Sequence, residues 1–113
     1  HEKGLKVALE NSGSMEAMGT RNLPFYAGTA ITYGLEAEVA VSMLTLNAAE
    51  ILGVSDRIGS LELGKDASLF VSKGDALDMM SNELRFALLQ GSFIDLDNPQ
   101  KALYRKYRKK YKP

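Results

Sequence analysis

The hydrophobic pattern of the chain changes at Gly53 from a helical period to an extended one. From Glu36 to Leu52, apolar residues recur three or four positions apart, which predicts helices with one buried stripe. The stripe consists of Val39, Met43, Leu46 and Leu52, with Leu35 and Ile51 beside it. Thr45 interrupts this stripe, so we predict two short helices with a break there and an end at Gly53. From Val54 onward apolar and polar residues alternate, and the predicted fold class is therefore α+β.

Four short strands are predicted in the extended half of the chain. Residues 61–63 and 67–71 are expected to pair antiparallel around a turn at Gly64, because their apolar residues alternate with polar ones. The run Leu84–Leu96 predicts two further strands, joined by a tight hairpin turn at Gln90-Gly91. Residues 73–83 between these pairs are predicted to be a loop.

The first part of the chain predicts a strand, a loop and another helix. Leu5–Leu9 is apolar on both faces, as in a strand buried within a sheet. Asn11–Asn22 is rich in Gly, Ser and Asn and is predicted to be a loop. Asn22 is expected to cap a helix that has Pro24 in its first turn and ends at Gly34.

The charges are divided unevenly between the body of the chain and its end. Residues 1–100 carry seven Lys and Arg against fourteen Asp and Glu, a net charge of −7, whereas residues 101–113 carry seven basic residues and no acid. Asn98 and Pro99 predict the start of a terminal helix here, and its aromatic stripe holds Leu103, Tyr104, Tyr107 and Tyr111. Its basic face could attract an anionic surface or lie on the acidic body of its own chain. Because the tyrosines keep helical spacing, we favour a packed aromatic face and do not expect nucleic acid as a partner.

Few residues in this chain carry obvious chemistry. There is no Cys, and the one His is His1 at the chain end, which is a poor basis for a metal site or a catalytic triad. Glu10 directly follows the predicted strand Leu5–Leu9 and is the best-placed carboxylate, although a solvated residue at a strand end is the more common interpretation. No apolar run reaches the roughly 18 residues that a membrane-spanning helix needs, and no basic-then-apolar leader is visible. The start at His1 rather than Met suggests a piece of a longer or processed protein, and no compartment is predicted.

One long run of residues carries a resemblance to a known family. The run contains Thr45, Asn47, Ala48 and Ala49, then Ile51-Leu52-Gly53, then Gly59-Ser60-Leu61-Glu62, then Gly64-Lys65-Asp66-Ala67 and Leu69. It resembles the C-terminal segment of the metal-dependent amidohydrolase superfamily, closest to its imidazolonepropionase-like and dihydroorotase-like branches. The similarity covers nearly the whole chain.

The resemblance implies a division of the chain into three parts. Residues 1–53 would supply the last strand and following helices of a (β/α)8 TIM barrel. Residues 54–97 would supply strands of a small composite β-sandwich, and residues 98–113 a basic C-terminal helix. The motif from Thr45 to Leu69 would then be architectural, since it would join the sandwich to the barrel.

The resemblance also implies an activity, namely hydrolysis of amide or cyclic amide C–N bonds by water that a zinc-type divalent metal activates. The usual ligands are an His-x-His pair, a mid-barrel Lys or carboxylate, two later His residues and an Asp at the end of strand eight. All but the last would lie upstream of residue 1, and Ser12 stands at the Asp position with Glu10 as the nearest carboxylate. No catalytic, cofactor-binding or metal-binding residue is therefore assigned in this chain.

Two functional classes follow from this resemblance. In the first, the chain is a structural part of a hydrolase, inactive alone, whose partner is the upstream barrel portion and whose loop Ser12–Asn22 would line the barrel mouth. In the second, it belongs to a non-catalytic family member, or is an interaction module that uses its basic helix. Because Leu5–Leu9 needs cover on both faces, we also expect the chain to self-associate.

Overall fold

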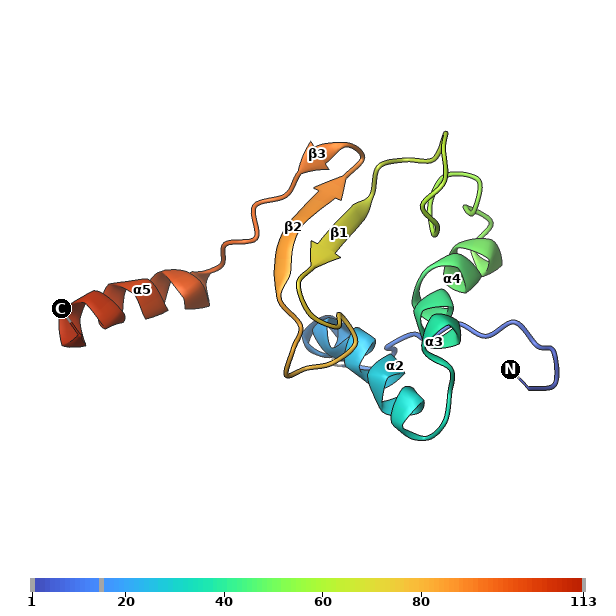
Figure 1. Cartoon of the computed structure of the whole chain (residues 1–113), viewed down its shortest axis with the longest axis horizontal. Coiled ribbons are helices and arrows are strands. Elements are labelled where there is room, and N and C mark those ends of the chain that lie inside the picture. The colour runs from blue at the N-terminus through green and yellow to red at the C-terminus, as the bar shows by residue number, and fades with distance from the viewer. Residues whose placement is uncertain (1, 15, 113) are drawn as a thin grey trace.

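The computed structural model describes residues 2–14 and 16–112, so His1 lies outside the described residues (Figure 1). Helices fill the first half of the chain, and a small sheet and a last helix fill the second half. The elements are α1 (Glu16–Gly19), η1 (Thr20–Asn22), α2 (Leu23–Thr32), α3 (Ala37–Leu44), α4 (Leu46–Ile51), β1 (Leu69–Ser72), β2 (Leu84–Leu89), β3 (Ser92–Phe93) and α5 (Pro99–Tyr111).

The helix α2 has the expected ends but not the expected cap. Pro24 lies in its first turn, and Gly34 follows its C-cap with a φ of 101°, a backbone conformation that glycine adopts readily. Asn22 occupies the N-cap position but its side chain makes no capping hydrogen bond, because the backbone there is already helical in η1. The prediction of a loop throughout Asn11–Asn22 is therefore wrong from Glu16 onward.

The predicted break at Thr45 is confirmed, with φ −122° and ψ −93° between α3 and α4. The Thr45 hydroxyl donates back to the carbonyl oxygen of Val41 (2.8 Å) and does not cap α4. Met43 is buried as predicted, but Leu52 is 75% exposed. The predicted stripe is thus wrong at its far end, because α4 ends one residue before Leu52 and no described element covers that side chain.

The segment Leu5–Leu9 was predicted to be a strand, and this prediction is wrong for the described structure. No strand lies beside it among residues 2–14 and 16–112, so it has no ladder of backbone hydrogen bonds. Its backbone bonds to helices instead: the Leu9 N–H donates to the carbonyl oxygen of Met43 (3.2 Å), and the Val7 carbonyl accepts from Asn47 Nδ2 (3.0 Å).

The sheet has the order β1-β2-β3, with both neighbouring pairs antiparallel. The hairpin predicted at Gln90-Gly91 is confirmed, and both residues have positive φ (49° and 80°), as in a type I′ turn. Strand β3 holds only Ser92 and Phe93, so the predicted continuation to Leu96 is wrong. Paired residues share a face, which places Leu69, Val71, Phe86, Leu88 and Phe93 on one face and Phe70, Ala87 and Leu89 on the other.

The predicted strand at residues 61–63 and its pairing with 67–71 are also wrong. Residues 57–66 instead form a closed loop, in which Asp66 N–H donates to the Arg57 carbonyl (2.8 Å) and the two side chains form an ion pair (2.7 Å). The side chain of Leu61 is 83% exposed. Strand β1 pairs with β2 in place of residues 61–63.

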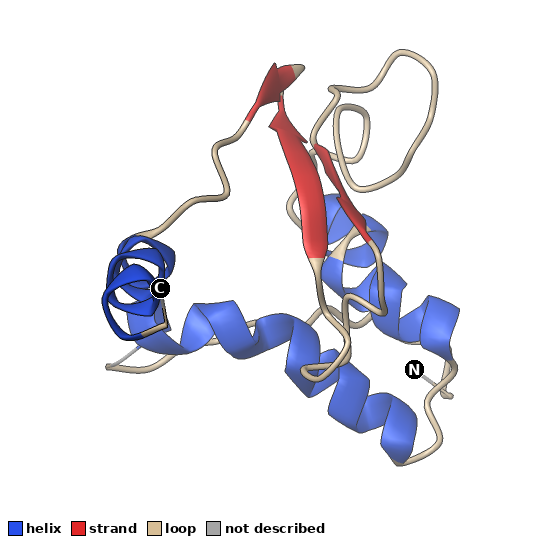
Figure 2. Ribbon diagram, turned by 60° about the vertical axis from the view of Figure 1, so that its left-hand side comes forward, coloured by secondary structure: helices blue, strands red, loops and turns tan. Residues whose placement is uncertain are grey.

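A small core joins the helices to the loop that leads into β2. Ala27 of α2, Ala40 of α3 and Leu77 of the loop are buried, and Leu9, Ile31, Leu35 and Leu44 pack around them. Gly28 allows the loop to approach α2 closely, because a Cβ there would lie 2.1 Å from the Leu77 carbonyl oxygen. Figure 2 shows the sheet standing over these helices, with α5 outside the core.

The chain exposes far more surface than a folded monomer of its mass normally does. A protein of 12.4 kDa is expected to expose about 6,100 Å² when folded, whereas this chain exposes 9034 Å². Both faces of the sheet contribute, since Phe93 is 78% and Phe70 is 54% exposed. The excess of about 2,900 Å² on this one chain is more than the roughly 800 Å² that each partner buries in a standard protein–protein interface.

Candidate functional site

The carboxylate of Glu10 and the hydroxyl of Ser12 lie together at the end of the Leu5–Leu9 segment. Ser12 Oγ donates to Glu10 Oε1 at 2.8 Å, and both side chains are exposed. The hydrogen bond orients the carboxylate without removing it from solvent. Glu10 is thus an exposed carboxylate that accepts one hydrogen bond from Ser12, and its role in chemistry stays a prediction.

Asn47 anchors the segment that carries Glu10. Its side-chain amide donates to the Val7 carbonyl (3.0 Å) and its amide oxygen accepts from Ser42 Oγ (2.9 Å). An ion pair between Lys6 and Glu50 adds a second link from the segment to α4. Sequence reasoning identified Asn47 as part of a family motif but missed this role, because the contact spans forty residues.

The turn formed by α1 and η1 lies against the same segment. A Cβ at Gly19 would lie 2.4 Å from Nδ2 of Asn11, so the Asn11 side chain would have to move for a larger residue at this position. The structure thus places part of the loop Ser12–Asn22 beside the Glu10–Ser12 pair.

The described residues do not fit a metal centre by themselves. Among residues 2–14 and 16–112 there is no group of three His, Cys, Asp or Glu side chains that could hold a metal ion. Glu10 is joined by a hydroxyl and not by a second carboxylate or an imidazole, whereas zinc sites use three or four such donors. His1, the only histidine, lies outside the described residues.

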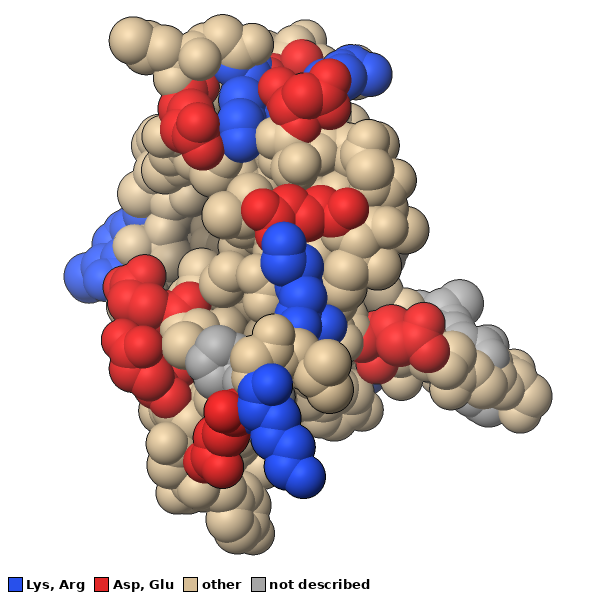
Figure 3. Space-filling view, turned by 90° about the vertical axis from the view of Figure 1, so that its right-hand side faces the viewer, with Lys and Arg blue, Asp and Glu red and all other residues tan. Residues whose placement is uncertain are grey.

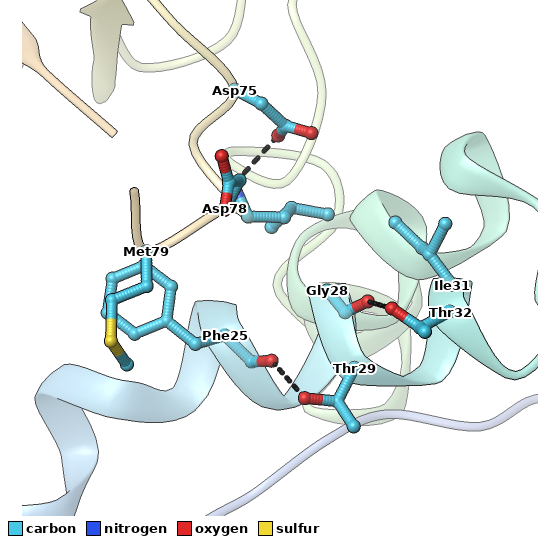
Figure 4. Close-up of a pocket in the computed structure, with 9 residues that line it drawn as sticks. Phe25, Gly28, Thr29, Ile31, Thr32, Asp75, Asp78 and Met79 are labelled. Atoms are coloured by element: carbon cyan, nitrogen blue, oxygen red, sulfur yellow. Dashed lines mark hydrogen bonds between the residues drawn. The ribbon is translucent and has the colours of Figure 1, made fainter. Parts of the chain in front are cut away.

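A groove separates α2 from the loop that packs on it, and we call it the α2 groove (Figure 4). Its volume is about 420 Å³. One wall comes from α2 and the other from the loop: the lining residues are Phe25, Gly28, Thr29, Ile31, Thr32, Asp75, Leu77, Asp78 and Met79. The groove therefore combines apolar side chains with two carboxylates, and the sequence analysis did not predict it.

Local hydrogen bonds hold the two carboxylates of the α2 groove in place. Asp75 Oδ1 accepts from the Leu77 N–H (2.8 Å). Asp78 accepts from the Ser81 hydroxyl and from the backbone N–H groups of Met80 and Ser81. These bonds, that of the Ser81 hydroxyl first, lower the pKa of Asp78 below its ordinary value. Asp78 is therefore ionised at neutral pH.

Helix α5 carries a basic face and an aromatic face, as the sequence predicted. Arg105, Arg108, Lys109 and Lys112 surround a hollow of about 290 Å³. Tyr107 and Tyr111 stack on the other side with ring centroids 6.3 Å apart. The aromatic face is not packed, however, since every residue from 97 to 112 is exposed. The alternative that α5 lies on the acidic body of its own chain is therefore wrong for this structure (Figure 1).

The start of α5 is fixed by two side chains. Asn98 Oδ1 accepts from the Lys101 N–H (2.8 Å), which confirms the predicted cap. Asp97 accepts two hydrogen bonds from the Arg105 guanidinium (2.9 and 2.5 Å). The hydrogen bonds from Arg105 lower the pKa of Asp97, and the same bonds raise the pKa of Arg105.

Comparisons with a family model and with known proteins point to the same family. Residues 5–101 match the model of the amidohydrolase family. The chain is 36% identical over 74 residues to the imidazolonepropionase of Syntrophobacter fumaroxidans (strain DSM 10017 / MPOB), a match that covers 65% of this chain and 18% of that protein. It is 36% identical over 69 residues to the imidazolonepropionase of Shouchella clausii (strain KSM-K16), covering 60% of this chain and 15% of that protein.

A solved structure of similar fold supports the same family. The crystal structure of an amidohydrolase from Thermotoga maritima MSB8 superimposes with a TM-score of 0.71 at 35% sequence identity. The match covers 83% of this chain but 24% of that protein. The chain thus spans less than a quarter of each of these relatives. The resemblance predicted from the sequence is confirmed, and the likeness is consistent with part of a TIM barrel. No helix of the described residues has the length and apolar character to cross a membrane.

Proposed function

The chain belongs to the amidohydrolase family, and from this premise we propose that it is the structural C-terminal part of an enzyme that hydrolyses amide or cyclic amide C–N bonds. In this proposal the chain is inactive alone. The upstream barrel portion of a longer protein supplies the remaining strands and covers the exposed apolar surfaces. The two imidazolonepropionases that the chain resembles favour a cyclic amide among the substrates.

The observation that carries this proposal is the excess of exposed surface. A chain of this mass that exposes 9034 Å² has apolar faces without cover. Leu5 is 69% exposed in a segment that no strand of the described residues pairs. An upstream barrel would pair Leu5–Leu9 and bury the surface around it.

We further propose the division of the chain that the family resemblance implies. Residues 1–53 would complete the barrel, residues 54–97 would join the small β-sandwich, and residues 98–113 would form the basic terminal helix. The observed sheet, with apolar residues on both faces, is suited to lie between a second sheet and the barrel.

Amidohydrolases are generally metal-dependent, and the described residues do not make a metal site. We therefore assign no reaction step through a metal to this chain. In the proposal, this chain's residues position one proton acceptor: the Ser12 hydroxyl orients Glu10 at the end of the segment, and Asn47 fixes that segment to α3 and α4. All His ligands would come from upstream residues.

A second function is favoured by one specific observation, the Ser12 side chain at the position where the resemblance implies an Asp. In a non-catalytic family member, the Glu10–Ser12 pair would have only a structural role. The chain would then act through its exposed surfaces, of which the basic face of α5 is the most highly charged.

Hydrolysis assays on the complete protein test the proposal. The complete protein, loaded with zinc, is tested against a panel of linear and cyclic amides beside the 113-residue chain under the same conditions. We expect turnover by the complete protein and none by the chain alone. If the zinc-loaded complete protein hydrolyses no member of the panel and its upstream sequence lacks the His-x-His pair, the proposal is wrong and the non-catalytic alternative holds.

A further inference from the structure

We propose that α5 of one copy docks into the α2 groove of a second copy, so that the chain forms a reciprocal dimer. This inference does not rest on the proposed function. It starts from two features of the described residues, namely the exposed helix and the groove lined by carboxylates and apolar side chains.

The aromatic face of α5 is not covered by any other described helix or strand. Every residue from 97 to 112 is exposed, and α5 makes no extensive packing with any other described helix or strand. Figure 1 shows α5 projecting away from the sheet and from α2. Leu103, Tyr107 and Tyr111 are half-exposed or more on one face. An amphipathic helix with an uncovered aromatic face is a typical helix-in-groove ligand.

Charge complementarity identifies a second copy as the occupant. Residues 101–113 carry seven positive charges, and residues 1–100 carry a net charge of −7. The two parts of the chain are therefore oppositely charged and equal in magnitude. Figure 3 shows acidic side chains spread over one face of the body, with Lys and Arg between them. Association of two copies would neutralise both parts.

The α2 groove matches the chemistry of α5. Phe25, Ile31 and Met79 offer apolar contacts to a tyrosine or leucine side chain. Asp75 and Asp78 stand on the loop side and would pair with the cations that flank the aromatic face of α5. These are Arg108, over the Tyr104 ring, and Lys110, over the Tyr111 ring. Asp78 stays ionised because its hydrogen bonds favour the charged form. The Thr29 hydroxyl donates to the Phe25 carbonyl (2.9 Å), and the Thr32 hydroxyl donates to the Gly28 carbonyl (3.3 Å). Both hydroxyls thus already donate a hydrogen bond within α2 and do not need an acceptor on a ligand.

Reciprocal docking of the two α5 helices also limits the assembly to two copies. If each α5 enters the groove of the other copy, the same contacts form twice around a two-fold axis, and no further copy is recruited. Residues 94–98, which are exposed except for the partly buried Leu96, would be the hinge in this arrangement. The expected species is therefore a dimer and not a filament.

The test begins with the mass of the 113-residue chain in solution, measured by sedimentation or light scattering over a range of concentrations. We expect a dimer at low salt that dissociates at high salt. The double variant Arg108→Glu, Lys110→Glu is expected to weaken the dimer at least about tenfold. Both residues are exposed, so this variant keeps the fold of the body.

A groove variant tests the other side of the contact. Asp75→Asn with Asp78→Asn removes both charges, while an amide oxygen can still accept the backbone hydrogen bond made to Asp75 and one of the two made to Asp78. It is expected to weaken the dimer to a similar degree. Circular dichroism confirms that its fold is retained.

Cross-linking makes the location testable without any change of charge in the groove. The chain has no natural cysteine, so Thr29→Cys in one copy and Lys110→Cys in another can be joined by a short thiol-specific reagent. We expect a cross-linked heterodimer from this pair, and much less from Lys3→Cys paired with Lys110→Cys.

Three results would overturn the proposal. The first is a monomer at all concentrations, including a monomer whose α5 binds vesicles of anionic phospholipid instead. The second is a dimer that neither charge variant weakens. The third is equal cross-linking from Thr29 and Lys3. Each of these results is independent of whether the complete protein hydrolyses amides.

Discussion

Replacing Gly28 with alanine tests the packing that creates both the core and the α2 groove. In an isolated helix this change stabilises, because alanine is better than glycine by about 1 kcal/mol. In this chain the added Cβ would lie 2.1 Å from the Leu77 carbonyl oxygen. Ordinary carbon–oxygen contacts are about 3.3–3.6 Å, so the loop must move away by about 1.2 Å or more.

The loop cannot move without exposing Leu77, which is 8% exposed and packs in the core with Ala27 and Ala40. Overpacking of this kind costs about 1–3 kcal/mol, and partial exposure of a leucine adds about 1 kcal/mol. After the gain in helix propensity, the Gly28→Ala variant is expected to lose about 1–3 kcal/mol of unfolding free energy. The melting temperature should fall by about 4 °C or more.

Thermal and denaturant unfolding, each at two protein concentrations, measure this loss. Thr32→Ala is the matched control, since it lies one turn further along α2, is exposed and adds no atom. It should be as stable as the natural chain or slightly more stable. If Gly28→Ala is as stable as Thr32→Ala, the loop does not pack on α2 and the account of the core and the groove is wrong.

Three further perturbations have defined outcomes. Asn98→Ala removes the side-chain cap of α5 and should destabilise that helix by about 1 kcal/mol, seen as lower helicity by circular dichroism. Gly59→Ala should destabilise the chain by about 1–3 kcal/mol in chemical unfolding, because φ is +98° there and the new Cβ would lie 2.7 Å from that of Ala49. Arg105→Gln should raise the pKa of Asp97 toward its ordinary value, measured by NMR titration of the carboxyl carbon. Because the pKa of Asp97 is lowered in the folded chain, its bonds to Arg105 stabilise α5 above the ordinary pKa, and this contribution is lost as the pH falls through the lowered value.

Local features of the chain were predictable from the sequence. The Thr45 break, the Gly34 helix end, the Gln90-Gly91 turn and the Asn98 cap each depend on a few neighbouring residues. Backbone preferences and side-chain hydrogen bonds of that range are properties of the sequence itself.

Strand pairing was not predictable to the same degree, because it depends on residues far apart. Residues 61–63 alternate as a strand should, yet the Arg57–Asp66 pair closes them into a loop. Leu5–Leu9 has the composition of a buried strand but no partner strand among the described residues. An apolar alternation shows that a segment can enter a sheet, and the neighbour decides whether it does.

The Glu10–Ser12 pair and the α2 groove also differ in how far the sequence could predict them. The contact between Glu10 and Ser12 spans two residues and was within reach of sequence reasoning. The α2 groove was not, because it arises from packing between α2 and a loop about fifty residues away. A glycine at position 28, inside a helix, was the one signal of that close approach.

Hydrogen–deuterium exchange at Leu5–Leu9 tests the central claim most directly, namely that this chain completes a larger amidohydrolase. The account predicts fast exchange in the chain alone at the amides that lack a backbone partner, because only the Leu9 N–H of this segment is seen to donate to another backbone group. In the complete protein, the same amides should exchange at least about tenfold more slowly, since they would join the ladder of the last barrel strand. Equal exchange in the two proteins would contradict the claim.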